Sequence, residues 1–362
     1  MSTAGSPQGV KAPLGGSDAH EVSKRGGKVT RRPVHGVLLL DKPLGLSSND
    51  ALQKAKWLMR AEKAGHTGTL DPLATGLLPL CFGAATKFSQ LQLEADKTYE
   101  AVARLGVKTS TGDAEGEVIS KRPVNVTEQD LSRVALRFTG LIRQIPPMHS
   151  ALKKDGKALY EYARAGVEVE RDAREVTIYK LNMALVPVDS EHMAIKMIVQ
   201  CSKGTYIRTL AEDIGEALGC GAHLTALRRV ETGGFDVAQC VTLAALEAMT
   251  DEERLNQLLP VESLLCEHTV VTLDSENAGR FLSGLRRRGN WPDRGQVAVY
   301  GPSTGSGQAQ RALLGTAHVV AGELIPGRLL SPLEIEQIVG DCGSEASVLH
   351  AAPASSLPEN RL

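Results

Sequence analysis

Segments with strand-like and helix-like patterns follow one another along this chain in no repeating order. Residues 37–40 form a short apolar run that stops at an Asp-Lys-Pro turn, and residues 51–58 then show helical spacing, with Ser48 as the expected N-cap. Residues 97–105 alternate as in a half-buried strand, and Thr127 with Asp130 then begins a helix that ends near Gly140. This mixture predicts an α+β fold.

The second half of the chain continues the mixture. Strands are expected at residues 176–181 and 193–201. A helix is expected at residues 205–218, where apolar residues recur at helical spacing and Gly219 follows. Between the two halves, residues 144–174 carry two consecutive prolines and many charges, which predicts an insertion that projects from the core.

Composition divides the chain into two domains and two tails. Short helical patterns end at Pro260, and beyond Cys266 short β-like pieces surround a Gly/Ser-rich loop at residues 301–307, which places a domain boundary near residues 261–269. Both ends of the chain are rich in small and polar residues without periodicity, which is typical of disorder. The expected parts are a disordered basic tail at residues 1–32, a large domain at 33–265 with its insertion at about 144–174, a small β-rich domain at 266–335 and a second disordered tail at 336–362.

The charge of the chain limits how it could contact a nucleic acid. Its 362 residues carry a formal net charge of −1, which argues against a wholesale nucleic-acid coat. Any contact with RNA must come from local basic clusters, although such a cluster on its own is more often an ordinary solvated surface. The clusters are Lys24, Arg25, Lys28, Arg31 and Arg32; Lys153, Lys154 and Lys157; Arg228 and Arg229; and Arg286, Arg287 and Arg288.

Several classes of protein are disfavoured by what the sequence lacks. Its six cysteines are scattered without a C-x-x-C pair, so neither a disulfide framework nor a cysteine zinc site is expected. No apolar run approaches the about 18 residues of a membrane span, and residues 1–32 lack the apolar centre of a secretory signal, so we expect a cytoplasmic protein. The common cofactor and nucleotide motifs are also missing.

One polar, glycine-rich segment could carry chemistry. Residues 65–78 read G-H-T-G-T-L-D-P-L-A-T-G-L-L and combine two glycine turns with His66 and Asp71. Because Asp71 precedes a proline, its backbone is biased toward extended geometry and away from a helix interior. On these grounds alone, Asp71 is either a structural turn residue, which is the commoner case, or a catalytic carboxylate.

The segment resembles the motif II catalytic loop of the TruB family of tRNA pseudouridine synthases. Other segments resemble that family's signatures in the same order along the chain, and the resemblance spans residues 34–332. They are Leu40-Asp41-Lys42-Pro43, Ser47-Ser48-Asn49-Asp50, Asp96-Lys97-Thr98-Tyr99, residues 106–113, and residues 201–209 with the sequence C-S-K-G-T-Y-I-R-T.

The resemblance implies a role for each matching residue. Asp71 corresponds to the nucleophilic aspartate, Tyr99 packs against the target base, and Arg208 pairs with Asp71. His66 enters the RNA loop as the base is extruded. Lys42 is expected to bind the substrate, the alternative being that it only shapes the floor of the active site. Tyr206 and Leu227 lie along the substrate pocket, although both residue types are also common in ordinary cores.

The resemblance also implies a fold, a reaction and a partner. The fold is that of the pseudouridine synthases, a mixed, largely antiparallel central sheet flanked by helices, with a small PUA-like C-terminal domain. The reaction converts uridine 55 in the TΨC loop of tRNA to pseudouridine by base flipping, and an accessory tRNA-folding activity is expected. No cofactor or metal is implied, because the isomerisation has no net redox change and loses no group. A monomer that needs no guide RNA is expected.

Two other functions fit the same residues. The chain could be an RNA-binding or RNA-folding protein in which modification is secondary. It could also be the catalytic subunit of a guide-RNA-dependent ribonucleoprotein, because that branch shares the aspartate loop. The activity of an Asp71→Asn variant separates the first alternative from the enzyme, and a reaction without guide RNA separates the second.

Overall fold

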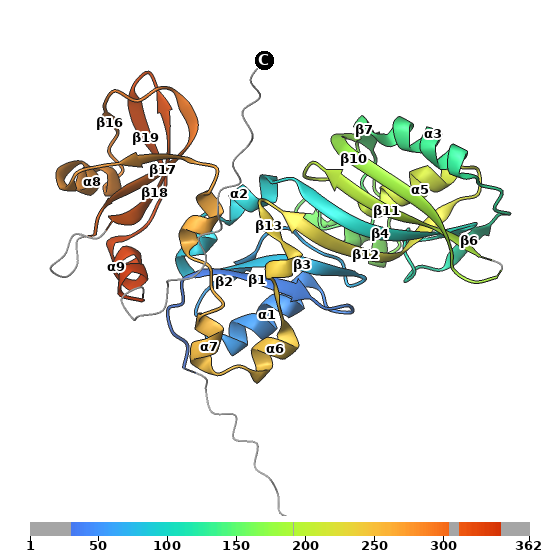
Figure 1. Cartoon of the computed structure of the whole chain (residues 1–362), viewed down its shortest axis with the longest axis horizontal. Helices are drawn as coiled ribbons and strands as arrows, with labels where there is room; N and C mark the ends of the chain where they lie inside the picture. Colours follow the sequence, from blue (N-terminus) through green and yellow to red (C-terminus); the bar gives the residue numbers. More distant parts are fainter. Residues whose placement is uncertain (1–29, 191, 304–310, 342–362) are drawn as a thin grey trace, which may run out of the picture. The chain divides into compact units, whose positions relative to one another are not determined.

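The computed structural model describes residues 30–190, 192–303 and 311–341 (Figure 1). Most of the expected N-terminal tail, with Lys24, Arg25 and Lys28, lies outside these residues, as do residues 342–362 of the expected C-terminal tail. The Gly/Ser-rich loop lies outside them from residue 304 onward. At the start of the described chain, Arg32 pairs with Ala61 in an isolated parallel bridge.

A 10-stranded mixed sheet forms the larger domain. Eight strands follow the path β14-β1-β3-β12-β4-β11-β10-β7, and off this path β13 pairs with β12 and β2 with β3. Most neighbours are antiparallel, whereas β1 with β14 and β3 with β12 are parallel. The α+β fold with a mixed, largely antiparallel sheet is therefore confirmed. The strands are β1 (Gly36–Lys42), β2 (Ala64–His66), β3 (Ala74–Phe82), β4 (Lys97–Leu105), β7 (Gly140–Gln144), β10 (Arg174–Pro187), β11 (Met193–Cys201), β12 (Ala222–Thr232), β13 (Phe235–Asp236) and β14 (Val241–Thr242).

Strand β12 lies in the middle of this sheet and brings distant parts of the sequence together. Leu227 on β12 is opposite Ala74 of β3 on one side and opposite Ala101 of β4 on the other. Two register shifts interrupt its pairing with β4, so its burial does not follow the simple alternation by which a strand is recognised in a sequence. No strand was predicted there.

Amphipathic helices cover the core face of the sheet. The predicted capping box of Thr127 and Asp130 begins α3 (Glu128–Phe138), and α5 (Ile207–Ala217) buries Leu210 and Ile214. The remaining helices of this domain are α1 (Ser48–Leu58), α2 (Ser89–Glu94), α4 (Leu159–Arg164), α6 (Leu243–Ala248) and α7 (Asp251–Leu255), with 3-10 turns η1 (Gly83–Lys87), η2 (Val237–Gln239) and η3 (Val261–Leu265).

The expected cap of helix α1 is displaced by one residue. The Ser47 side chain accepts a hydrogen bond from the Asp50 backbone N–H and is the N-cap. Ser48, which the sequence suggested for this role, is buried, and its hydroxyl instead contacts the backbone of Leu70. Ser48 was therefore wrong as the cap, because two adjacent serines compete for one position.

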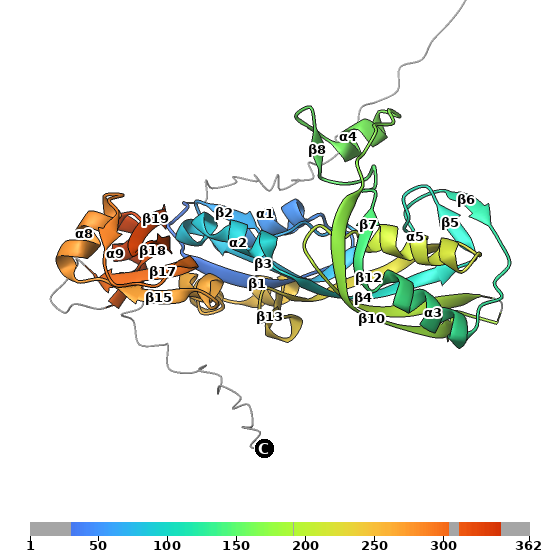
Figure 2. The same ribbon diagram turned by 90° about the horizontal axis from the view of Figure 1, so that it is seen from above.

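The insertion between β7 and β10 leaves the sheet at one point. Gln144 and Arg174 are partners in the antiparallel ladder, so the chain between them starts and ends at neighbouring positions. It contains a short hairpin, β8 (Lys153–Lys154) and β9 (Lys157–Ala158), followed by α4, and Figure 2 shows these elements projecting from the sheet. Elsewhere, β5 (Val107–Thr109) and β6 (Val118–Lys121) form a separate hairpin.

The C-terminal part contains a five-stranded sheet with the order β15-β17-β18-β19-β16. Its strands are β15 (Thr269–Thr272), β16 (Arg287–Arg288), β17 (Arg294–Pro302), β18 (Arg311–Val320) and β19 (Glu323–Leu329), with the helix α8 (Ser275–Leu282). The expected β-rich C-terminal domain is confirmed. Here the Arg311 guanidinium lies 3.9 Å from the centroid of the Tyr300 ring.

The expected C-terminal tail begins too early. Residues 332–341 form helix α9 (Pro332–Asp341), so residues 336–341 are helical rather than disordered. Ser331 and Glu334 exchange hydrogen bonds as a capping box, with Pro332 at the first helical position, and Ile335 is buried. The Ser-Pro-Leu-Glu sequence carries this signal.

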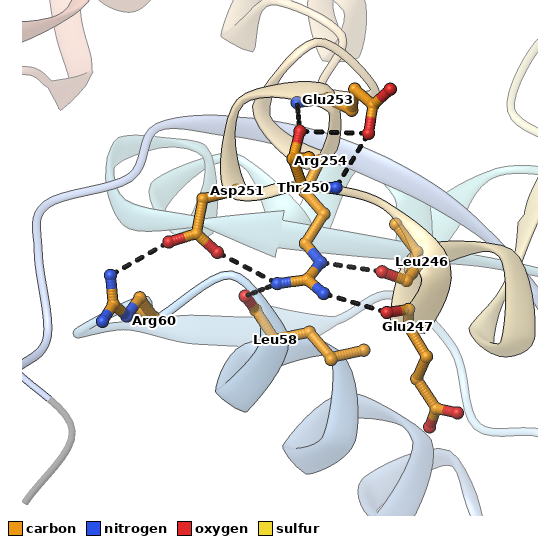
Figure 3. A network of polar contacts seen from close by, with 8 residues as sticks. All are labelled: Leu58, Arg60, Leu246, Glu247, Thr250, Asp251, Glu253 and Arg254. Atoms are coloured by element: carbon orange, nitrogen blue, oxygen red, sulfur yellow. Dashed lines mark hydrogen bonds and ion pairs between the residues drawn. The ribbon is translucent and has the colours of Figure 1, made fainter.

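Arg254 shows how a guanidinium joins elements by holding backbone carbonyls (Figure 3). It donates to Leu246 O at 2.7 Å, to Glu247 O at 3.2 Å and to Leu58 O at 3.3 Å, and its ion pair with Asp251 measures 3.0 Å. Asp251 also pairs with Arg60 at 2.9 Å. The network connects α1, α6 and α7.

Within the described residues, no helix has the length and apolar character needed to span a membrane. In the same part of the chain, no group of three or more His, Cys, Asp or Glu side chains is arranged to hold a metal ion.

Candidate active site

The loop that carries Asp71 connects β2 to β3 and is fixed along its length by hydrogen bonds. Ala74 N donates to Asp71 O at 3.0 Å, which closes a tight turn with Pro72 at its second position. The Ser48 hydroxyl donates to Leu70 O and accepts from Leu70 N, at 3.0 and 2.7 Å. These bonds fix the backbone directly before and after the Asp71 side chain.

Asp71 forms an ion pair with Arg208, as the family resemblance implied. Arg208 Nη2 lies 2.9 Å from Asp71 Oδ2. The Arg208 side chain is 6% exposed, whereas that of Asp71 is 39% exposed, so the carboxylate is partly exposed while its cation is enclosed. The guanidinium also donates to Thr111 O at 3.2 Å and to His149 O at 2.6 Å, which fixes its orientation.

A second carboxylate, Asp113, completes the site and was given no role from the sequence. Its Oδ2 lies 3.5 Å from Arg208 Nη1, and its side chain is 4% exposed. Asp113 Oδ1 accepts from the Thr111 hydroxyl at 2.5 Å and from Glu115 N at 3.1 Å. One arginine therefore lies between a buried, fixed carboxylate and a more accessible one.

The surroundings of Asp71 shift the protonation of this site. Burial raises the pKa of Asp71 above its usual value, Arg208 opposes that rise, and the charge of Asp113 adds to it. Burial likewise lowers the pKa of Lys42 to about 8, against the attraction of Asp71. The Lys42 ammonium donates to Pro43 O and Leu46 O at 2.9 and 2.5 Å, so Lys42 supports the loop after β1.

Tyr99 and Leu227 come to the same part of the sheet from β4 and β12. Tyr99 is 9% exposed and is the ladder partner of Val199 on one side and of Arg229 on the other. Leu227 is half-buried and packs against the main core. Leu227 thus lies on β12, the strand next to β3, which follows the Asp71 loop, and Tyr99 lies one strand further on, on β4.

Tyr206 and His66 lie on two further elements. Tyr206 is the N-cap residue of α5, and its backbone N–H and carbonyl bond the Gln144 side chain at 3.0 and 3.2 Å. His66 ends β2 and is half-buried, and its Nδ1 has no hydrogen-bond partner among the described residues. Burial, followed by the charge of Arg229, lowers the pKa of His66, so this ring is neutral near pH 7.

The basic clusters differ in how exposed they are. Lys153, Lys154 and Lys157 are exposed on the insertion. Arg286 and Arg288 are also exposed, and both pair with Glu323.

The Arg228–Arg229 cluster is wrong as a surface patch. Arg229 is 1% exposed, and Arg228 forms an ion pair with Asp41 at 2.7 Å. Adjacent residues of a strand point to opposite faces, so these two cannot act together on one surface.

Comparisons with known proteins agree with this arrangement. A profile described as "TruB family pseudouridylate synthase (N terminal domain)" matches residues 56–207, and "tRNA pseudouridylate synthase B C-terminal domain" matches residues 208–266. A tRNA pseudouridine synthase B from Verminephrobacter eiseniae is 62% identical over 325 residues, which is 87% of this chain and 96% of that protein. The protein of the same name from Ralstonia nicotianae is 59% identical, over 84% of this chain and 96% of its own length.

Solved structures support the fold. A chain in the crystal structure of a Cbf5-Nop10-Gar1 complex aligns with a TM-score of 0.59 and 24% identity, over 85% of this chain and 87% of that one. At that identity the likeness concerns the fold alone. Together with the full-length relatives, these findings show that the chain belongs to the TruB family of tRNA pseudouridine synthases.

Proposed function

We propose that this enzyme isomerises uridine 55 in the TΨC loop of tRNA, with Asp71 as the essential carboxylate. The observation that carries the proposal is the position of the Arg208 guanidinium, which forms ion pairs with a partly exposed Asp71 and with a buried Asp113. The reaction breaks the bond from uracil N1 to the ribose and remakes it from C5. It therefore needs one reactive carboxylate and a pocket that retains the free base.

The neighbouring residues supply the remaining roles in this proposal. Tyr99 packs against the base, and Tyr206 and Leu227 line the pocket around it. Extruding the stacked uridine costs a few kcal/mol. His66 enters the RNA loop and replaces the stacking that is lost. A neutral imidazole suits this role, because a flat uncharged ring stacks on bases without bringing a buried charge.

The purified protein should form pseudouridine in an unmodified tRNA transcript without any guide RNA. A stand-alone enzyme carries its own RNA-recognition surface, whereas a guide-dependent subunit takes its specificity from base pairing. The measurement maps pseudouridine along the transcript after incubation, and the expected product is confined to position 55.

A transcript with cytidine at position 55 is the matched control and should remain unmodified. Absence of product in the uridine transcript would contradict the stand-alone function. Product at another uridine would contradict the assignment of position 55 while leaving the enzyme activity intact.

The exposed lysines of the insertion should contribute to tRNA affinity through phosphate contacts. Changing Lys153, Lys154 and Lys157 to Ala should reduce the slope of log affinity against log salt by about 1 for each phosphate that is no longer neutralised. The rate at saturating tRNA should change little, because these side chains do not contact Asp71. Affinity would be measured by filter binding across a range of salt concentrations.

Lys196 provides a control for this substitution. Lys196 is exposed on β11. It lies three residues before Val199, and Val199 is the ladder partner of Tyr99. Because strand side chains alternate, Lys196 points to the face opposite Val199. Lys196→Ala should leave the salt dependence unchanged, and an equal effect from both changes would argue against the insertion as the RNA contact.

A further inference from the structure

Arg229 is a buried cation that the proposed mechanism does not use. It is 1% exposed and is among the largest fully buried side chains of the described chain. Its neighbour Arg228 pairs with Asp41, whereas no ion pair to a carboxylate is found for Arg229 among the residues that the structure describes. Burying a guanidinium without a carboxylate partner costs free energy. The hydrogen bonds that Arg229 does form are therefore expected to serve the fold or the site.

Those hydrogen bonds go to both sides of the Asp71 loop. Arg229 Nε donates to Leu77 O at 2.7 Å, and Nη2 donates to Gly68 O at 3.3 Å. Gly68 lies three residues before Asp71 and Leu77 lies six residues after it. The guanidinium therefore holds together the backbone on each side of the reactive carboxylate, as Arg254 holds three carbonyls elsewhere.

Two glycines, one in the Asp71 loop and one in β3, fit closely against this arginine. A Cβ at Gly76 would come within 2.3 Å of Arg229 O, which no side chain could tolerate. A Cβ at Gly68, whose φ is +79°, would lie 3.3 Å from Arg229 Nη1. Gly76 lets strand β3 approach the backbone of Arg229, and Gly68 lets the loop approach its guanidinium.

Arg229 also faces Tyr99. The two residues are direct ladder partners of β12 and β4, so their side chains leave the same face of the sheet. Burial raises the pKa of the Tyr99 hydroxyl, while the charge of Arg229 and a hydrogen bond from it oppose that rise. One guanidinium is thus shared between the Asp71 loop and the tyrosine.

We propose that Arg229 is a positioning residue: its hydrogen bonds to Gly68 and Leu77 hold the Asp71 loop, and its place opposite Tyr99 on the same face of the sheet fixes the tyrosine relative to that loop. The inference rests on the proposed roles of Asp71 and Tyr99. Displacing reacting groups by about 1 Å can cost on the order of 100-fold in rate. Substrate binding by the insertion does not depend on this contact.

Arg229→Lys tests the inference, because lysine keeps the charge but lacks the fork. We expect kcat to fall on the order of 100-fold while KM for tRNA changes little. Arg254→Lys is the matched control, since it removes a comparable fork far along the chain from Asp71. It should lower the melting temperature and leave kcat unchanged. A kcat for Arg229→Lys close to that of the wild type overturns the inference, and so does an equal loss in both variants.

A double-mutant cycle with Tyr99→Phe shows whether Arg229 acts through the tyrosine. The loss caused by Arg229→Lys should be several-fold smaller when the Tyr99 hydroxyl is already absent. Equal losses in both backgrounds would overturn the coupling to Tyr99.

If Arg229→Lys does not fold, Gly68→Ala approaches the same contact from the loop. It should lower kcat at least tenfold and be similarly weakened by Tyr99→Phe, whereas an undiminished kcat overturns the proposal. An inactive wild-type enzyme would instead refute the proposed function.

Discussion

Replacement of Asp71 by Asn is expected to lower the rate of pseudouridine formation on the order of 10⁴-fold or more. The amide has the size of the carboxylate but can neither attack carbon nor accept a proton at neutral pH. The C5 hydrogen of uridine is lost when C5 bonds to the ribose, so release of tritium from C5-labelled tRNA measures the reaction. Affinity for tRNA should remain nearly unchanged, because the basic clusters are intact.

The fold of this variant should be at least as stable as that of the wild type near pH 7. Burial raises the pKa of Asp71 in the folded state, so the folded protein holds this proton more tightly than the unfolded chain does. The resulting stability is present at acid pH and is lost as pH rises through the folded-state pKa. Asn removes the partly buried charge that causes the loss, and Asp113 still pairs with Arg208.

If the Asp71→Asn variant modified tRNA at the wild-type rate, Asp71 could not be the essential carboxylate. A variant that is inactive yet still promotes tRNA folding would show that the two activities are separate. It would also show that the RNA-folding interpretation and the enzyme describe one protein. Loss of tRNA binding together with activity would contradict the division between a reactive carboxylate and distant binding clusters.

Arg208→Gln should lower the rate by about 10²- to 10³-fold and move the acid limb of the pH–rate profile to higher pH. In the proposed mechanism the reactive form of Asp71 is the carboxylate, so activity should be present above its pKa and fall as pH drops through it. Arg208 lowers this pKa against the effect of burial. Without the cation, the pKa of Asp71 rises further, and more alkaline conditions are needed to ionise it.

Asp113→Asn is a control that should move the acid limb of the pH–rate profile in the opposite direction. The charge of Asp113 raises the pKa of Asp71, so its removal should move the acid limb to lower pH. The rate on the plateau should still fall, because Arg208 loses one of the groups that orient it. Limbs that move in the same direction in both variants would contradict the electrostatic account, and a single-turnover pH series would reveal this.

The sequence predicted the Asp71–Arg208 pair but not the rest of the network. The pair was implied by two motifs, each legible as a short segment. Asp113 comes to the site because its turn pairs with Leu224 of β12 through an isolated bridge, and that strand was not recognised. Long-range ladder contacts of this kind have no local signal in one sequence.

Arg229 was misassigned for a related reason. Two adjacent arginines look like a basic patch until the strand that contains them is known, after which alternation separates them. Bulges on either side, at Leu224/Ala226 and Arg229/Glu231, obscure the pattern that would have identified the strand. By contrast, α3 and β11 lay where simple periodicity placed them, because no irregularity interrupts either element.

The position of Arg208 has a consequence for how substrates are selected. Its guanidinium contacts Asp71 and also donates to His149 O, at the base of the insertion. If the insertion binds RNA as proposed, an RNA that distorts it should also disturb Arg208 and, through it, Asp71. A misfolded tRNA could then be held as firmly as a correct one and still react slowly. Correct and misfolded tRNAs would then differ in their rate of modification and not in their affinity for the enzyme.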